Sequence, residues 1–424
     1  MAMSTPAEVV RGAGARMAVS PAPTRVLVPY ISTYLGGVRR VLGDGLPRLA
    51  AAPELHVTYA ELCCNQPDMD AMERAGVEVE RALGVAGESA LGRGGRVRRW
   101  GGIAAQVPRL ARMASRLAAR FAGYDVCYVH GHRELVLALA AATLCGRGRA
   151  PALVWHWHGP PLSVGAGGRG AWGARLFASL GARACARVIA ISGFSARLMR
   201  EMGVPPERIT IVINAAEVGP AAAATAPEQP LPARAAGQVT LLLACASLRP
   251  HKGVHLAVEA LKELPPDHVL WVTGDTADAV AAQYLAELVR LAGELGVGDR
   301  VHFIGARRDV HAVMRAADAV LVPTVSEEPF GLVAAEAQLL GVPVVGSMRG
   351  ALPEILADGA GALFEPGQPQ ALADAVAAVT GDPALRRRLV DGARSRAERL
   401  YSYDRWSREV TAVLIEAGSR RRRH

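Results

Sequence analysis

Glu328-Pro-Phe-Gly-Leu-Val-Ala-Ala-Glu336 predicts a loop that turns directly into a helix. It follows an apolar run, Ala319–Val322, that is typical of a buried strand. If the helix begins at about Phe330, Glu336 lies about two turns into it while Glu328 stays on the loop before it. Both carboxylates can then face one cleft at the carboxyl end of the strand.

The start of this helix predicts an anion site. The first backbone N–H groups of a helix have no partner within the helix and attract negative charge. We therefore expect the amides of Phe330, Gly331 and Leu332 to lie against the diphosphate of a nucleotide. One of the two carboxylates would accept hydrogen bonds from ribose hydroxyls and the other from sugar hydroxyls. The alternative is an ordinary helix whose glutamates face solvent.

A second segment, Ala246-Ser-Leu-Arg-Pro-His-Lys-Gly253, follows another predicted strand and precedes a helix. Its two cations, Arg249 and Lys252, would face the cleft and neutralise a diphosphate leaving group. A surface loop with two positive charges is the alternative. Lys252 and Lys262 are the only lysines in an arginine-rich chain, which favours a chemical role for Lys252.

The rest of the chain predicts two α/β halves, because short apolar runs alternate with helical patterns. The first half has runs at Arg25–Tyr30, Leu55–Ala60, Val126–His130, Leu153–His158, Val188–Ser192 and Ile209–Ile213. The second half has runs at Val239–Ala246, Val269–Thr273, Val301–Ile304, Ala319–Val322 and Val342–Gly346. This alternation predicts mainly parallel sheets, whose ligands bind at the carboxyl ends of the strands. Two facing halves would place the site in the cleft between them.

The domain boundaries are expected where the composition changes. We predict a disordered leader at 1–24, an N-terminal Rossmann-like domain at 25–218, an Ala-, Pro- and Gln-rich linker at 219–237, and a C-terminal Rossmann-like domain at 238–395. Helical patterns run from about Pro369 to Ala417 and break near Tyr401–Asp404. A C-terminal helix at 396–417 is expected to pack back on the N-terminal domain, followed by a basic tail at 418–424.

Composition excludes several classes of protein. The 424 residues are 51% hydrophobic, which suits two folded domains and argues against disorder. Apolar stretches such as Leu135–Cys145 are too short to span a membrane, and residues 1–24 lack the apolar core of a secretory signal, so we expect a cytoplasmic protein. The net charge of +9 invites acidic partners, but no nucleic-acid module is present. The six cysteines form no C-x-x-C pair, which predicts buried free thiols.

The C-terminal half resembles the retaining glycosyltransferases of family four, which have the GT-B fold. The resemblance rests on Ser247–Gly253, His302–Gly305, Ala317-Asp318, Pro323, Glu328–Ala337, Gly341–Val345, Gly350 and Pro353-Glu354. The N-terminal half matches more loosely, through Gly36-Gly37, His158-Gly159, Ile189–Ser192 and Asn214. The chain departs from the family at Ala246-Ser247, where Gly-Arg is common, and at Asn214-Ala215, where Asn-Gly is common.

The resemblance implies a role for individual residues. Glu336 would bind the donor ribose and Glu328 the donor sugar. Lys252 would bind the diphosphate with Arg249 as the second cation, and His158 would lie near the transferred sugar. The remaining nucleotide-binding positions that it implies are Gly37, Ser247, Gly305, Phe330, Gly331 and Leu332.

The reaction implied is transfer of a sugar from a nucleoside-diphosphate sugar, with UDP the expected nucleotide, to an acceptor hydroxyl with net retention. No enzymatic nucleophile is evident, so the acceptor hydroxyl would lose its proton to the departing phosphate while the protein stabilises the diphosphate. No metal is required, because cations and a helix N-terminus neutralise the charge. A sugar-nucleotide epimerase and a catalytically silent nucleotide-binding partner subunit are the alternatives.

Two further groups of residues have less defined roles. Beside His158, the histidines at 130, 132 and 156 are expected to be structural or to face the acceptor, since no carboxylate spacing supports a metal site. The glycine-rich segment Gly165–Gly170 lacks the strand-before, helix-after context of a phosphate loop. We interpret it as a mobile loop near the acceptor.

The segment Ile103–Phe121 predicts an amphipathic helix, with arginines recurring at 109, 112, 116 and 120. Such a helix could lie on an anionic bilayer, as expected of a peripheral enzyme with a lipid-linked or polysaccharide acceptor. The rival is a surface helix that packs its apolar side on the sheet, in an enzyme with a small soluble acceptor such as a cyclitol. Few aromatic residues are available as interfacial anchors, which favours the soluble acceptor. The sequence makes no prediction of oligomeric state.

Overall fold

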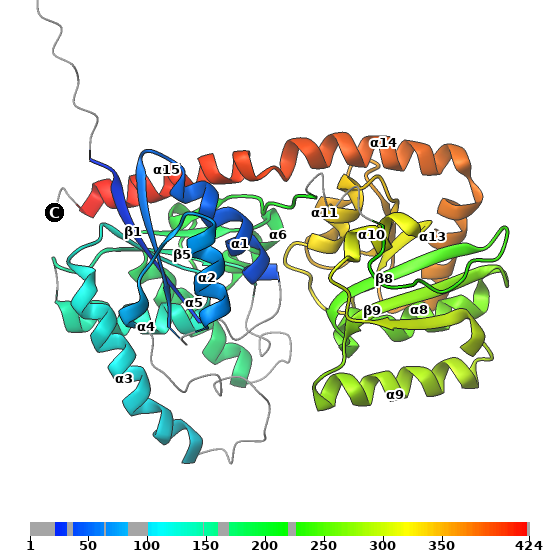
Figure 1. Cartoon of the computed structure of the whole chain (residues 1–424), viewed down its shortest axis with the longest axis horizontal. Coiled ribbons are helices and arrows are strands. Elements are labelled where there is room, and N and C mark those ends of the chain that lie inside the picture. Colours follow the sequence, from blue (N-terminus) through cyan, green and yellow to red (C-terminus); the bar gives the residue numbers. More distant parts are fainter. Residues whose placement is uncertain are drawn as a thin grey trace, which may run out of the picture.

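The computed structural model describes residues 22–31, 37–62, 65–83, 101–146, 148–159, 169–218 and 226–421, and shows two α/β domains side by side (Figure 1). Each domain is built on a parallel sheet, as predicted. Most of the predicted leader, Gly36, residues 165–168 of the glycine-rich segment, 219–225 of the linker and 422–424 of the tail lie outside the described residues.

Within the described residues, the N-terminal sheet has seven strands in the order β3-β2-β1-β4-β5-β6-β7. The strands are β1 Thr24–Tyr30, β2 Leu55–Glu61, β3 Glu78–Val79, β4 Val126–Val129, β5 Ala152–Trp157, β6 Arg187–Ala190 and β7 Ile209–Ile211. The chain order reverses between β1 and β4, and the carboxyl ends on either side of this point form the crevice in which α/β sheets bind ligands.

The helices of this domain are α1 Gly37–Ala50, α2 Gln66–Arg74, α3 Gly101–Phe121, α4 His132–Cys145, α5 Arg169–Ala184 and α6 Gly193–Glu201. Short 3-10 turns occupy Arg81–Leu83 and Pro206–Arg208. Central strands such as β4 and β5 are buried almost along their whole length, because helices cover both faces of the sheet.

The C-terminal sheet has the order β10-β9-β8-β11-β12-β13 among the described residues. Its strands are β8 Val239–Ser247, β9 His268–Asp275, β10 Val301–Gly305, β11 Ala319–Val322, β12 Val344–Ser347 and β13 Ala362–Phe364. The helices are α8 Val254–Glu263, α9 Ala279–Glu294, α10 Val310–Ala316, α11 Leu332–Leu339, α12 Leu352–Ile355, α13 Pro369–Gly381, α14 Pro383–Leu400 and α15 Tyr403–Arg421, with 3-10 turns at Pro250–Lys252 and Gly298–Arg300.

Helices α14 and α15 run one after the other along the same side of both domains (Figure 1). The break between them falls at Tyr401–Ser402, close to the predicted position. Helix α15 packs on α1 and on strands β1, β4 and β5 of the N-terminal sheet. Its Trp406 is fully buried there, and a Cβ atom on Gly45 would lie 2.7 Å from the indole ring. The N-terminal core is therefore built from both ends of the chain.

The chain runs from one domain to the other twice, and the two connecting segments are adjacent. One crossing follows β7, and the other joins α14 to α15. The backbone N–H of Ala216 on the first donates to the carbonyl of Tyr401 on the second at 2.9 Å. Arg405 also donates to the carbonyl of Ile213. The two connections thus form one hydrogen-bonded unit between the domains.

The amphipathic helix α3 buries its apolar side over residues 108–121, where the structure describes its side chains. Met113, Leu117 and Phe121 belong to the N-terminal core, and α3 packs on α4. Arg112, Arg116 and Arg120 are exposed, and Arg120 pairs with Glu80 at 3.3 Å. This is the arrangement of a surface helix whose apolar side packs on the fold. None of the described helices is both long enough and apolar enough to cross a membrane.

Candidate functional site

A cavity of about 340 Å³ lies between the two domains. Residues of the N-terminal domain that line it are Gly37, Val38, His158, Ile191 and Asn214. The C-terminal domain contributes Leu243–Cys245, Lys252, Leu321–Thr324 and Glu328–Val333. These positions follow the carboxyl ends of strands in both sheets, which is where the sequence pattern predicts the ligand site.

Lys252 and Glu328 form an ion pair at this cavity, with Nζ of Lys252 2.9 Å from Oε2 of Glu328. Burial disfavours the charged form of Lys252, but the adjacent carboxylate and its hydrogen bond outweigh that cost, so the pKa of Lys252 is raised. The ammonium group therefore keeps its proton at neutral pH inside the cleft. Both predicted residues lie together, as expected of groups that act on one ligand.

Two glycines hold these residues in place. Gly253 has a φ of +72°, and a Cβ atom there would lie 1.9 Å from the carbonyl oxygen of Pro323. The loop that carries Lys252 therefore lies directly on the end of β11. A Cβ atom on Gly350 (φ +62°) would lie 2.2 Å from the carbonyl oxygen of Glu328. Side chains at either position would force the Lys252 and Glu328 loops away from the cavity.

Helix α11 begins at the cavity. Gly331 precedes its first residue with a φ of +97°, and Gly331, Leu332 and Val333 all line the cavity. Phe330 is buried and meets Tyr401 edge to face, with ring centroids 5.5 Å apart. The predicted helix start is thus observed two residues after Phe330. The N-terminal end of a helix is a favourable position for an anion.

Glu336 lies behind the cavity lining rather than on it. The residue is 3% exposed, and its Oε1 is 2.9 Å from Nη1 of Arg40, which belongs to α1 of the other domain. Its Oε2 is 3.2 Å from Nε2 of His311, which also lies 2.9 Å from Nη2 of Arg40. A ligand hydroxyl that binds Glu336 would share this carboxylate with Arg40 or displace it.

Three other predicted residues lie outside the cavity lining. Arg249 makes a two-point ion pair with Asp278, which also accepts hydrogen bonds from the first turn of α9. Ser247 donates to the carbonyl oxygen of Asp275 at 3.3 Å. Gly305, at the end of β10, is exposed with a φ of +69°. The structure therefore groups Lys252 with Glu328 and does not bring Arg249 to them, so a role for Arg249 as second cation stays a prediction.

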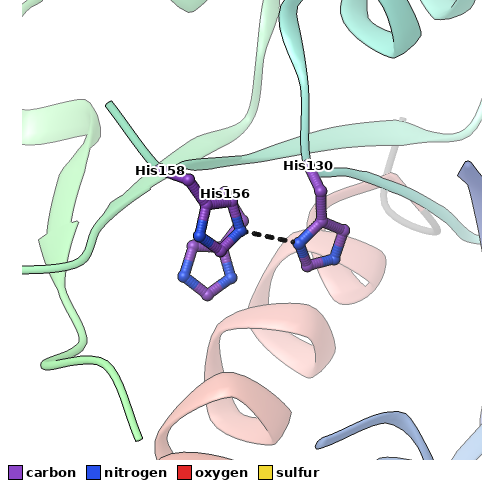
Figure 2. A group of neighbouring side chains, drawn as sticks. All are labelled: His130, His156 and His158. Atoms are coloured by element: carbon purple, nitrogen blue, oxygen red, sulfur yellow. Dashed lines mark hydrogen bonds between the residues drawn. The ribbon is translucent and has the colours of Figure 1, made fainter. Parts of the chain in front are cut away.

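His158 lines the cavity from the N-terminal side, opposite Lys252 and Glu328. Figure 2 shows its ring beside those of His130 and His156, at the ends of β4 and β5. Nε2 of His158 is 3.0 Å from Nδ1 of His130. Burial lowers the pKa of His158 to about 3 and that of His130 well below its ordinary value. This wall therefore presents neutral imidazole to the cavity at neutral pH.

Sequence reasoning missed the contacts that join the two walls. The hydroxyl groups of Ser192 and Ser195, at the start of α6, donate to the carbonyl oxygen of Pro329 at 2.7 and 3.2 Å. Arg40 reaches Glu336 across the same gap. Ser192 belongs to a segment that the sequence analysis singled out, but nothing in the pattern indicates its partner. Arg40 carries no sequence signal beyond its place one turn into α1.

The arrangement suits a ligand with a negatively charged end and a polar neutral end. A half-buried cation and a helix N-terminus lie on one wall, and a neutral ring that forms hydrogen bonds lies on the other. The site thus provides electrostatic stabilisation of an anion and orientation of a second group.

Two protein-family models match the chain. The model described as "Glycosyltransferase Family 4" matches residues 35–218, and the one described as "Glycosyl transferases group 1" matches residues 231–396. The two matches follow one another and correspond to the two domains of the structure.

Curated relatives share part of the sequence. A D-inositol 3-phosphate glycosyltransferase of Xylanimonas cellulosilytica is 39% identical over 189 residues, which are 44% of this chain and 42% of that protein. The protein of the same name from Mycolicibacterium smegmatis is 38% identical over 170 residues, 39% of this chain and 37% of that protein. The alignments therefore span about two fifths of the length of these curated relatives.

Solved structures share the whole architecture. The Anabaena protein HepE, crystallised in complex with UDP and glucose, has a TM-score of 0.74 at 22% identity. The superposition covers 93% of this chain and 100% of the HepE chain. Sucrose-phosphate synthase of Thermosynechococcus elongatus has a TM-score of 0.74 at 20% identity, with 93% and 98% covered. These similarities confirm the predicted GT-B fold.

Proposed function

Because the chain belongs to glycosyltransferase family 4, we propose that it transfers a sugar from a nucleoside-diphosphate sugar to an acceptor hydroxyl group with net retention at the anomeric carbon. The observation that carries this proposal is the cavity between the domains. Lys252, Glu328 and the start of α11 line one wall, and His158 lines the other. A donor would lie with its diphosphate on the charged wall and its sugar toward the neutral one.

In this proposal the protein acts by stabilising charge and orienting the substrates. Lys252 and the first amides of α11 stabilise the negative charge that grows on the leaving diphosphate. Glu328, held beside Lys252, accepts hydrogen bonds from the donor sugar, and His158 contacts that sugar from the opposite wall. The acceptor oxygen forms the new bond on the face that the diphosphate leaves, and its proton passes to the departing phosphate.

UDP is the proposed nucleotide of the donor. The support is indirect: HepE, which shares the fold, was crystallised with UDP and with UDP-glucose. Glu336 is the proposed ribose ligand, because it is a buried carboxylate about one turn from the anion-binding end of α11. Arg40 and His311 hold its two oxygen atoms in a fixed direction.

A small soluble acceptor of the cyclitol class is proposed for the hydroxyl substrate. Curated relatives with 38–39% identity over the aligned segments are named for D-inositol 3-phosphate. The apolar side of α3 is buried in the core, so it is not available to enter a bilayer. A lipid-linked acceptor would require another apolar surface.

The test starts with a thermal-shift screen of UDP-, GDP- and ADP-sugars on the full chain. The donor that stabilises the fold is then incubated with inositol and inositol phosphate, and the released nucleoside diphosphate is measured. Lys262→Ala is a matched control for Lys252→Ala, because Lys262 is the other lysine of the chain and is exposed. Donor binding without release above the Lys252→Ala level would instead identify a catalytically silent nucleotide-binding subunit.

A further inference from the structure

Three histidines of the N-terminal wall lie close enough to share one ligand. Figure 2 draws these residues, His130, His156 and His158, as neighbours. Each offers a ring nitrogen, and these nitrogens lie within 4.8 Å of one another. Nδ1 of His130 and Nε2 of His158 are 3.0 Å apart. Zinc–nitrogen bonds of about 2.0–2.1 Å in a tetrahedron place two ligand nitrogens about 3.3 Å from each other. This pair is hydrogen-bonded, so a shared ion would replace that bond, and the two nitrogens would need to move apart by only about 0.3 Å to bind it.

The strands explain why the rings converge. His156 and His158 are two residues apart along and just after β5, so their side chains leave the strand on the same face. His130 directly follows β4, which pairs with β5 in parallel register. The ring centroids of His156 and His158 are 4.5 Å apart, and that of His130 lies 5.2 and 5.3 Å from them. A site at the adjoining ends of two paired strands is held more precisely than one on long loops.

Two of the rings have a nitrogen without a partner. His130 is 2% exposed and His156 is fully buried, and Nε2 of each makes no hydrogen bond in the structure. Nδ1 of His156 lies 2.5 Å from the hydroxyl group of Tyr128. In the tautomer in which Nδ1–H donates to that oxygen, the lone pair of Nε2 is free to bind an ion. A buried nitrogen that lacks a partner is unfavourable, and a bound ion would give His156 the missing one.

The chemistry of the three ligands selects the ion. Imidazole nitrogen suits zinc, copper, nickel and cobalt, whereas magnesium, calcium and manganese prefer oxygen ligands. The group as the structure describes it consists of histidines alone. Three protein ligands leave a fourth position open, and His158 places that position toward the cavity.

We propose that His130, His156 and His158 form a binding site for one divalent transition-metal ion of the zinc class, in the N-terminal wall of the cleft. The site is separate from the catalytic charge of Lys252 and Glu328 on the opposite wall. Its ion would occupy the side of the cavity that receives the donor sugar and so would inhibit transfer. The inhibition rests on the proposed function, whereas the binding of the ion does not.

The binding test uses the full chain without an affinity tag and zinc alone, in competition with a chromogenic chelator. We expect one equivalent of zinc per chain, and binding at least about tenfold weaker in His130→Gln and in His156→Gln. His132→Gln is the matched control, because His132 is close in sequence but its ring packs on Trp155 and Phe177 instead. Circular dichroism of each variant without metal shows whether it is folded. If only one of His130→Gln and His156→Gln is folded, its zinc affinity alone decides the test.

Cobalt(II) gives an independent measurement, because a four-coordinate cobalt site absorbs visible light strongly and a six-coordinate aqueous ion does so weakly. The absorption should appear in the wild type and in His132→Gln and be lost in the other two variants. Zinc binding that is absent in the wild type, or unchanged in both His130→Gln and His156→Gln, would overturn the proposal.

The consequence for transfer is tested separately. One equivalent of zinc should lower the transfer rate of the wild type, a chelator should restore it, and His156→Gln should resist the inhibition. A chain that binds zinc at these residues but transfers no sugar under any donor would contradict the proposed function and leave the metal site standing. A wild type that holds one zinc ion and transfers at its full rate would contradict the inhibition.

Discussion

In the C-terminal domain several buried or half-buried side chains stay charged because they are paired, whereas in the N-terminal domain several stay neutral because they are buried. Arg307 and Asp309 pair with both side chains buried, and Lys252 pairs with Glu328. In the N-terminal domain, burial raises the pKa of Glu134 to about 7 and lowers that of His158 to about 3. Charged side chains therefore line the wall proposed to receive a diphosphate, whereas the described residues that line the wall proposed to receive a sugar are uncharged.

The largest effect expected from this contrast belongs to Lys252. Lys252→Ala should lower kcat by about 10²-fold or more, because it removes the cation that stabilises the leaving diphosphate. Steady-state release of the nucleoside diphosphate measures the loss. Lys262→Ala should retain wild-type activity. If kcat of Lys252→Ala falls by less than tenfold, the charge of Lys252 is not what stabilises the leaving diphosphate.

The two carboxylates of the charged wall should differ from one another. Glu336→Ala should weaken UDP binding by about 10- to 100-fold, because hydrogen bonds to a charged group are worth about 1.5–3 kcal/mol. Glu328→Ala should retain UDP affinity and lose turnover and discrimination between sugars. Calorimetric titration with UDP separates the two, and an equal loss of affinity in both variants would contradict the assignment.

Glu134 tests the neutral side of the comparison through pH. Its pKa is raised to about 7 by burial, against an ordinary value of about 4.3 for an unfolded chain. Between these values the folded state holds a proton that the unfolded state has lost, so the stability that Glu134 provides falls as pH rises.

Glu134→Gln cannot lose this proton and should gain stability relative to the wild type between pH 5 and pH 8. The gain should be about 2–3 kcal/mol at most. Urea unfolding of both proteins at the two pH values measures it, with the exposed Glu263→Gln as control. A difference between the proteins that does not change with pH would mean that Glu134 is ionised in the fold.

His158→Ala should have a smaller effect, on transfer alone. The ring lies on the wall opposite the proposed diphosphate site, so UDP affinity should stay nearly unchanged. Transfer should fall by about tenfold or less, which corresponds to one hydrogen bond to a neutral group. A loss of UDP affinity as large as that expected of Glu336→Ala would show that the nucleotide also contacts the wall on which His158 lies.

Removal of metal ions should have the smallest effect on turnover. Dialysis against EDTA should leave the transfer rate unchanged or raise it slightly, because Lys252 and the start of α11 supply the charge that stabilises the diphosphate. Activity that disappears in EDTA and returns with magnesium or manganese would contradict this mechanism.

The features that the sequence predicted are those set by local pattern. The run Ala319–Val322 is strand β11 with the predicted bounds, and the helix after Glu328 begins within two residues of the expected position. Lys252, Glu328 and His158 line one cavity because each follows the carboxyl end of a parallel strand, and these ends meet in a fold of this class. The two-residue strand β3 and the three-residue strand β13 were missed, because so short a run has no readable alternation.

The features that the sequence could not predict depend on how the two domains meet. Arg40 reaches Glu336 from the other domain, and Ser192 reaches Pro329 in the same way. Arg249 pairs with Asp278 because an aspartate that caps α9 lies next to its loop, a contact that spacing does not encode. The convergence of His156 and His158 was readable in principle from their two-residue spacing on a strand, but His130 joins them only through the pairing of β4 with β5.

The position of α15 also bears on the order in which the protein forms during synthesis. The N-terminal domain leaves the ribosome first, yet its core lacks Trp406, Val410 and Leu414 until α15 follows at the other end of the chain. All the described strands of the C-terminal domain, by contrast, have been made before α15 appears. The half that is synthesised first is therefore completed last, and until then it exposes an apolar face that a chaperone or a neighbouring chain can bind.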